Sequence, residues 1–196
     1  ARNRYYQALL GYTVVFPDEW LIDETTTTVT ASNAEQGSIH IEVQRIQENL
    51  EPRVFIRDEM GIGALQKSEK LEQYRLLGHT GVAVSPETGN TERVAAIYLG
   101  PRVFTFRAEI TDAEASDEID EQLLASIRTF RAIQQGETAS GTEAKIKFVQ
   151  ASEFFDFSVV AQSSRIANYP EESLRLLNGY YPRGTPEAGE WVKLIE

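Results

Sequence analysis

The chain has 196 residues, a formal net charge of -11 and no cysteine. Without cysteine it has no disulfides, thiolate metal sites or cysteine nucleophiles, and the acidic excess argues against a nucleic-acid partner, which needs clustered Lys and Arg. Apolar runs such as "YTVVF" and "VAAIYL" are far shorter than the roughly 20 residues that span a membrane as a helix. We therefore expect no transmembrane segment.

Residues 1–133 predict an α+β domain with a mostly antiparallel sheet. In "SIHIEVQRI", Ile39, Ile41 and Val43 alternate with His40, Glu42 and Gln44, as in a half-buried strand. Similar strand signals occur at 12–16, 25–31, 71–76, 81–84, 93–99 and 103–110. Helical spacing appears at 52–62, which opens with a proline, and at 117–130, where five apolar residues form one stripe.

Residues 134–143, "QQGETASGTE", predict a flexible linker because they lack large apolar side chains. Residues 144–196 then predict a small domain with the order strand, helix, helix, strand, a βααβ unit. Its elements are expected at 145–150, 155–163, 170–177 and 191–195.

The stretch "GYTVVFPDEWLIDETTTTVTA" contains an aromatic-Pro-x-x-Trp turn between two strands, formed by Phe16, Pro17 and Trp20. This pattern resembles the opening of the PsbP-like family, whose fold is an α/β sandwich. The resemblance implies a PsbP-like domain over residues 1–133. We expect Trp20 to follow the Pro17 turn into the core of that domain.

The C-terminal residues resemble a LysM-type unit in their βααβ order, in "LLN" at the end of the second helix, and in "AGEWVKLIE" before the end of the chain. Two positions depart from that family. Ser152-Glu153-Phe154 stands where a Gly-Asp-Thr turn is expected, and Ala188 replaces the proline before Gly189. Because the first departure falls in the loop that lines the glycan groove of LysM units, we expect weak or absent binding to peptidoglycan.

The combination of a closing helix with "SIRTFRAI", a linker and a LysM-like unit ending in "RLLNGYYPRGTPEAGEWVKLIE" resembles the C-terminal region of a bacterial family of secreted zinc metallopeptidases. In that family the catalytic domain lies upstream and carries H-E-x-x-H. The chain starts at Ala1 rather than Met, so we expect a signal peptide, a tag or an upstream region to have been removed.

No catalytic, cofactor or metal residue is predicted in this chain. An H-E-x-x-H helix needs two histidines one turn apart, whereas His40 lies in a strand and His79 in a predicted "GHTG" turn. A metal site with His40 and Glu42 is the less favoured alternative to a solvated strand face. The acidic run 112–122 could hold calcium or paired acid and base groups, but carboxylates at a helix N-terminus also simply complement the helix dipole.

The candidate docking or ligand surface consists of Glu153 and Phe154 in the loop after the first strand of the second domain, and Tyr180 and Tyr181 in the loop before its last strand. Exposed aromatic residues stack on sugars and anchor interfaces, although a small domain also needs large side chains for its core. We expect Trp191 to pack in that core and leave both alternatives open for the tyrosines.

The favoured interpretation is a non-catalytic C-terminal accessory region of a periplasmic zinc-dependent metallopeptidase, for docking, substrate presentation or regulation. Its partner would be the upstream peptidase domain or an envelope protein. The alternative is a free-standing binding protein of the cell envelope that recognises peptidoglycan or a protein partner. An autonomous hydrolase that uses the acidic cluster is the least favoured.

Overall fold

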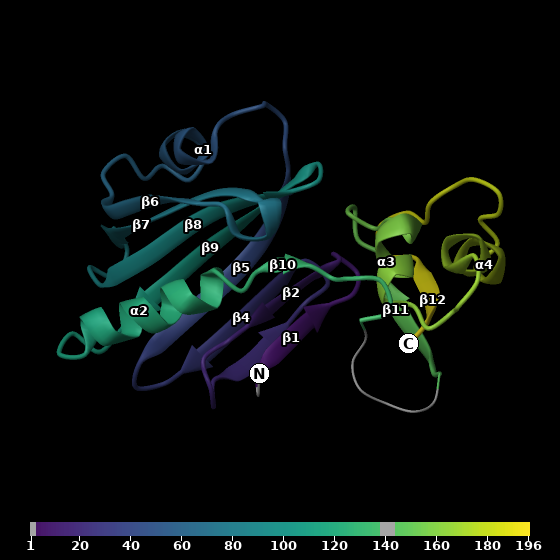
Figure 1. Ribbon diagram of the computed structural model, residues 1–196, viewed down its shortest axis with the longest axis horizontal. Coiled ribbons are helices and arrows are strands. Elements are labelled where there is room, and N and C mark those ends of the chain that lie inside the picture. The colour runs from purple at the N-terminus through teal and green to yellow at the C-terminus, as the bar shows by residue number, and fades with distance from the viewer. Residues whose placement is uncertain (1–2, 138–143) are drawn as a thin grey trace. The chain divides into compact units, whose positions relative to one another are not determined.

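The computed structural model describes residues 3–137 and 144–196 (Figure 1). The chain divides into two compact units: the first holds the residues up to Arg4 together with Val14–Arg131, and the second holds Tyr5–Thr13 and Ala132–Glu196. Residues 138–143 of the expected linker lie outside the described residues. Gln134–Glu137 belong to the second unit, where the Gly136 N–H donates to the carbonyl of Gln162 at 3.3 Å.

The first unit is built on a seven-stranded antiparallel sheet among the described residues, which confirms the expected α+β class. The strand order is β3 (Leu21–Glu24), β4 (Thr28–Asn33), β5 (Gly37–Arg45), β9 (Arg102–Ile110), β8 (Thr91–Leu99), β7 (Leu77–Val84) and β6 (Gln66–Leu71). Apart from the large sheet, β1 (Arg4–Gln7), β2 (Tyr12–Val15) and β10 (Arg131–Ala132) pair in that order, and the unit boundaries fall within these three strands.

The strand expected at 71–76 is wrong, because β6 ends at Leu71 and a short 3-10 helix follows over Gln73–Arg75. Tyr74 and Arg75 there have positive φ angles of 53° and 62°, which a strand does not allow. The two predicted helices are present but shorter, as α1 (Pro52–Asp58) and α2 (Ser116–Ile127).

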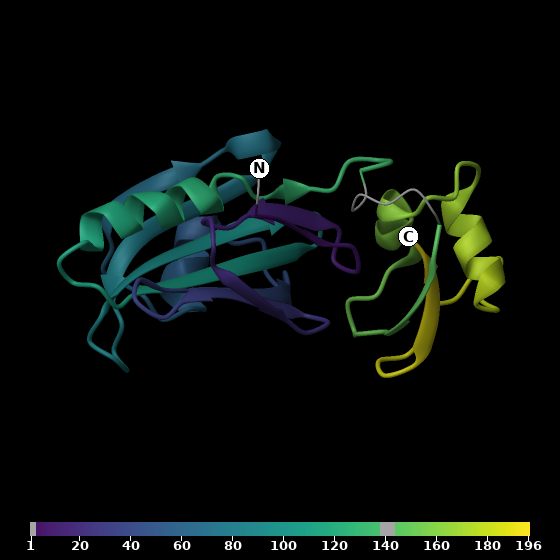
Figure 2. The same cartoon turned by 90° about the horizontal axis from the view of Figure 1, so that it is seen from below.

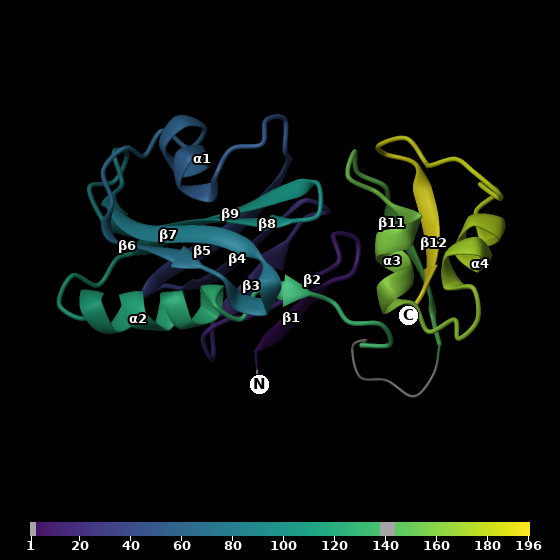
Figure 3. The ribbon, with the colours of Figure 1, turned by 45° about the horizontal axis from the view of Figure 1, so that its top comes forward.

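Helices α1 and α2 lie on opposite faces of the large sheet (Figure 3). Side chains alternate along a strand, and neighbouring residues of β8 illustrate it: Val94 packs against Phe55 and Ile56 of α1, whereas Arg93 reaches Asp120 of α2. Figure 2 shows the same layering from another side.

The core on the α2 face is aromatic and aliphatic. The ring of Phe130 lies 5.1 Å from that of Phe104 and 5.4 Å from that of Phe106, measured between centroids. The residue that follows the Pro17 turn, Trp20, is only 4% exposed and donates its indole N–H to Gln36 at 2.9 Å. The expectation that Trp20 belongs to the core is therefore confirmed.

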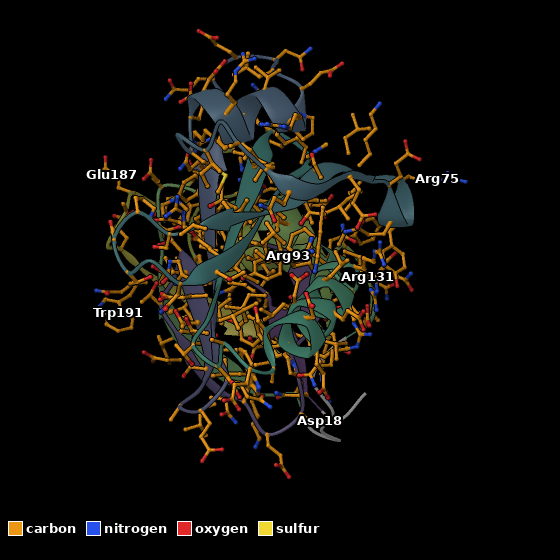
Figure 4. The ribbon with its side chains drawn as sticks, turned by 90° about the vertical axis from the view of Figure 1, so that its left-hand side faces the viewer. Asp18, Arg75, Arg93, Arg131, Glu187 and Trp191 are labelled. Atoms are coloured by element: carbon orange, nitrogen blue, oxygen red, sulfur yellow. The ribbon has the colours of Figure 1, made fainter. Side chains whose placement is uncertain are left out.

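Arg93, labelled in Figure 4, forms a buried ion pair with Asp120 between sheet and helix. The relative exposures of the two residues are 1% and 3%. The guanidinium donates two hydrogen bonds to the carboxylate, at 2.5 and 2.8 Å, and a third to Thr80 at 3.2 Å. Lys67 adds a hydrogen bond to Asp120 at 3.1 Å. Burial opposes ionisation of Asp120, but the bonds from Arg93 and Lys67 outweigh it and hold the pKa of the carboxyl below its usual range.

A break in strand pairing positions Lys67. The register between β6 and β7 shifts between Gln66 and Glu69, and Lys67 has a positive φ of 46°. A β-bulge re-aims side chains in this way, and here it turns the ammonium onto Asp120 and Asp117.

The second unit has the expected βααβ order: β11 (Ile146–Gln150), α3 (Phe157–Ser163), α4 (Pro170–Leu177) and β12 (Trp191–Ile195), with the two strands antiparallel. Asp156 caps α3, because its carboxylate accepts from the Ser158 N–H at 2.8 Å. The core of this unit lies between the helices and one face of the sheet. It includes Phe155, Phe157, Val160, Leu174, Val192 and Leu194.

We expect Trp20→Ala to lower the free energy of unfolding by about 3 kcal/mol or more, as truncation of a buried aromatic residue does. Urea unfolding followed by circular dichroism measures it. A loss within about 0.5 kcal/mol, typical of surface positions, would contradict the packing described for Trp20.

We expect Asp120→Ala to lower the free energy of unfolding by about 3–5 kcal/mol, because it leaves the buried Arg93 guanidinium without its counter-ion. The matched control is Asp117→Ala, which removes an exposed carboxylate from the same lysine and should cost at most about 1 kcal/mol.

The pKa of Asp120 is lower in the folded protein than the ordinary carboxyl value of 3.8. The ionised carboxylate therefore contributes its full stabilisation of the fold above that ordinary value, and this stabilisation is lost as the pH falls through the folded pKa. Asp120→Asn should therefore show a shallower loss of stability in acid than the wild type. Equal slopes of unfolding free energy against pH for the two proteins would exclude a stabilising role for the ionised Asp120.

Candidate functional site

The two loops that the sequence singled out meet at their bases in the second unit. The N–H of Ala151 donates to the carbonyl of Glu190, and the N–H of Gly189 donates to the carbonyl of Ala151, both at 2.8 Å. These bonds extend the β11–β12 ladder and fix where the loop of Tyr180 and Tyr181 returns to the sheet.

Tyr180 is held within the unit. Its ring lies 5.8 Å from that of Phe157, and its hydroxyl donates to the Glu190 carboxylate at 2.7 Å. This hydrogen bond lowers the pKa of Glu190 and raises the pKa of Tyr180. Of the two alternatives left open for the tyrosines, Tyr180 fits core packing.

Arg175 ties the same loop to the core. Its guanidinium lies over the Phe157 ring, 4.9 Å from the centroid, and it donates to Glu171 at 3.0 Å and to the carbonyl of Gly184. A cation against an aromatic face adds to packing. The loop is thus fastened at Gly184 as well as at Tyr180.

The other three candidates differ in exposure. Phe154 is buried, whereas Glu153 is exposed and Tyr181 is 57% exposed. Glu153 and Tyr181 thus remain the accessible side chains of the predicted surface.

The expectation for Trp191 is wrong: it is 67% exposed (Figure 4). Val192 and Leu194 point into the core of the second unit, so the alternate residues Trp191 and Lys193 point out. Cross-strand pairing puts Phe148 and Gln150 on this outer face opposite Lys193 and Trp191. We call this the open face of the β11–β12 sheet; it is formed by Ile146, Phe148, Gln150, Trp191, Lys193 and Ile195.

Sequence reasoning missed the open face, although a signal for it was present. The alternation in "WVKLI" pairs Trp191 with a lysine, which indicates the solvent side of a strand. The expectation followed the large apolar side chain of Trp191 rather than its position in the alternation, which faces solvent. Ile146 and Phe148 are 61% and 59% exposed, so the face is apolar over both strands.

A groove of about 640 Å³ lies in the first unit, beside the segment from Met60 to Lys67. Its charged lining includes Lys67, Asp117, Asp120 and Arg107. The first three belong to the ion-pair network already described, and Arg107 lies 3.6 Å from Glu92. Burial raises the pKa of Glu92, and Arg107 partly opposes that shift.

The two histidines lie in strands of the first unit. His40 accepts or donates a hydrogen bond with Thr30 at 2.7 Å on the sheet face opposite Ile39 and Ile41. His79 was expected in a turn but is part of β7, where its ring bonds Ser68 at 2.7 Å. Burial, together with the charges of Arg53 and Lys70, lowers the pKa of His79. Within 3–137 and 144–196, no group of His, Asp and Glu side chains is arranged to hold a metal ion.

Comparison with known proteins shows similarity at the level of solved structures. The solution structure of cyanobacterial PsbP (CyanoP) from Synechocystis sp. PCC 6803 matches with a TM-score of 0.49 and 13% identity, over 66% of this chain and 91% of that one. A crystal structure from Bacteroides thetaiotaomicron VPI-5482 matches with a TM-score of 0.47 and 13% identity, over 74% of this chain and 53% of that one.

No protein-family model matches the chain, and no curated protein matches it. In the part of the chain that the structure describes, none of the helices has the length and apolar character needed to cross a membrane.

We expect Trp191→Ala to change the free energy of unfolding by no more than about 0.5 kcal/mol, because the side chain is exposed. Leu194→Ala, three residues along the same strand but 4% exposed, should cost about 2–5 kcal/mol. Thermal unfolding of both variants measures the contrast. Equal losses would place Trp191 in the core.

Proposed function

We propose that this chain is a non-catalytic accessory region of a periplasmic zinc metallopeptidase, and that it docks the enzyme onto a protein partner. The resemblance of the C-terminal stretch to that peptidase family supports the assignment. The observation that carries the docking role is the open face of the β11–β12 sheet: Phe148 and Trp191 are exposed beside a core that is filled by other residues.

Exposed aromatic residues of this kind are informative because folding does not account for them. Phe157, Leu174, Val192 and Leu194 are all at most 4% exposed and pack together without Trp191. Aromatic residues on a rigid strand supply large contact area at low entropic cost, which is why they anchor interfaces.

The domain assignments belong to the same proposal. A PsbP-like first unit is supported by the buried Trp20 after the Pro17 turn and by the antiparallel sheet between two helices. A LysM-like second unit is supported by its βααβ order and by Asn178 at the end of α4.

Protein docking is favoured over glycan binding at the loops of the second unit. Phe154 is buried there, and the Tyr180 hydroxyl is bonded to Glu190. These two groups would otherwise line a sugar groove. The alternative, a free-standing envelope protein that binds peptidoglycan, is supported by the exposed ring of Tyr181.

The test is retention of the 196-residue chain on purified peptidoglycan sacculi. We expect no retention above that of an unrelated acidic protein. Retention that is lost on Tyr181→Ala and kept on Tyr169→Ala, an exposed tyrosine outside both loops, would replace docking with glycan binding.

The link to a peptidase is tested by sequencing the gene on the 5′ side of the codon for Ala1. A reading frame that continues to the 5′ side of the codon for Ala1 and encodes H-E-x-x-H would support it, and a signal peptide that ends at Ala1 would contradict it.

A further inference from the structure

In the part of the chain that the structure describes, the outer edge of β11 carries backbone groups without partners. Lys145 and Glu196 exchange both of their backbone hydrogen bonds, at 2.7 and 3.0 Å. In an antiparallel pair such residues alternate with residues whose N–H and C=O point away from the partner strand. Ile146, Phe148 and Gln150 are therefore the outward-pointing residues, and within residues 3–137 and 144–196 no hydrogen bond reaches the backbone groups of Ile146 or Phe148 on that side.

The outer edge of β12 is closed by contrast at Lys193 and at the carbonyl of Ile195. The side-chain amide of Asn178 accepts from the Lys193 N–H at 2.8 Å and donates to the Lys193 carbonyl at 2.9 Å, as a neighbouring strand would. The carbonyl of Ile195 accepts from the Ser164 hydroxyl at 3.1 Å and from the Arg165 N–H at 3.3 Å. Among the residues that the structure describes, the same small sheet thus has one edge that is occupied at Lys193 and Ile195 and one edge that is open.

An open edge strand is a template for pairing with another chain, and proteins usually shorten, bend or cover it. β11 has neither proline nor a bulge in its pairing with β12. Its side chains at the edge, Ile146 and Phe148, are more than half exposed. The strand therefore offers hydrogen-bonding groups and apolar contacts at one place.

The positive charge along this edge favours one kind of partner strand over another. "AKIKFVQ", residues 144–150, contains two lysines and no acidic residue, in a chain whose net charge is -11. The Lys147 ammonium lies 3.6 Å from the Glu196 carboxylate but its side chain is still 54% exposed, so it can also meet a carboxylate of a partner. A second copy that paired through β11 would bring four lysines of the two edges together. An acidic extended segment would instead meet opposite charge.

We propose that the open edge of β11 binds an extended segment of a partner protein as a third, antiparallel strand, and that this segment alternates apolar and acidic residues. The proposal rests on the proposed function only in assuming a protein partner.

The alternation follows from the register. Residues of the added strand that pair with Ile146 and Phe148 exchange backbone hydrogen bonds with them and share the open face with the Phe148 ring. The residues between them share the other face with Lys145 and Lys147, where a carboxylate is favoured. Main-chain bonds supply affinity and alternate side chains supply specificity, as in strand addition generally.

The probe is a fluorescein-labelled, end-blocked peptide, Glu-Ile-Glu-Val-Glu-Ile-Glu, titrated with the 196-residue chain and followed by fluorescence anisotropy. We expect saturable binding that weakens as salt is raised, because exposed charges are screened. A peptide with lysine in place of glutamate should not bind.

Backbone methylation separates strand addition from nonspecific contact. N-methyl groups on the isoleucine and valine residues remove the N–H groups that face β11 and should weaken binding at least about tenfold. N-methyl groups on the glutamates remove N–H groups that face away, and this matched peptide should bind within about threefold of the parent, since no bond to β11 is lost.

On the protein side, Phe148→Pro removes an outward N–H without breaking the β11–β12 ladder, and proline is tolerated on edge strands. It should abolish binding. The double variant Lys145→Gln and Lys147→Gln keeps the edge and should weaken binding and flatten its salt dependence. Leu176→Ala, an exposed residue on α4, is the control and should bind as the wild type does. Circular dichroism checks that each variant is folded.

Equal binding of the two methylated peptides, or full binding by the lysine double variant, would overturn the proposal. So would a homodimer in sedimentation that Phe148→Pro dissociates, because the edge would then belong to a second copy. Retention on sacculi that depends on Phe148 would assign the edge to a glycan and overturn it as well. Because the assay uses the purified chain, its outcome is independent of whether the gene encodes a peptidase.

Discussion

The buried pair of Arg93 and Asp120 is the constraint on which the first unit depends. A guanidinium in the middle of a sheet and a carboxylate on a helix are both costly to bury, and each is tolerable only opposite the other. Because α2 can satisfy Arg93 in one position, the pair fixes the helix on the sheet. The bulge at Lys67 adds a further hydrogen bond to the same carboxylate. Packing of Phe130 against Phe104 and Phe106 buries apolar surface around the ion pair, but it is less directional than the hydrogen bonds of the pair.

Local patterns predicted much of the fold, and the errors have physical causes. The central strands β5, β8 and β9 were predicted within two residues, because β5 alternates clearly and because β8 and β9 are nearly continuous apolar runs that are buried along most of their length. The edge strand β6, "QKSEKL", has no apolar face to alternate and was missed. The partnership of Arg93 with Asp120 joins two residues 27 positions apart, and no local pattern encodes such a pairing.

The candidate site shows the same division between local and long-range information. Tyr180 and Tyr181 are adjacent in sequence, yet one packs on Phe157 and the other is exposed, and this depends on how the loop is fastened by Arg175. Asn178 looked like the end of a helix, which it is, but its amide also serves a strand fifteen residues later. The open edge of β11 is defined by the outward backbone groups of Ile146 and Phe148, which no such partner reaches among the described residues.

The closure of β12 by one asparagine has a consequence for assembly. A two-stranded sheet with both edges available could link copies in series, each strand templating the next, and grow into a fibre. With Asn178 bonded to the outward backbone groups of Lys193, a second copy cannot pair with β12 at that position. The side-chain amide therefore protects that edge against serial strand addition.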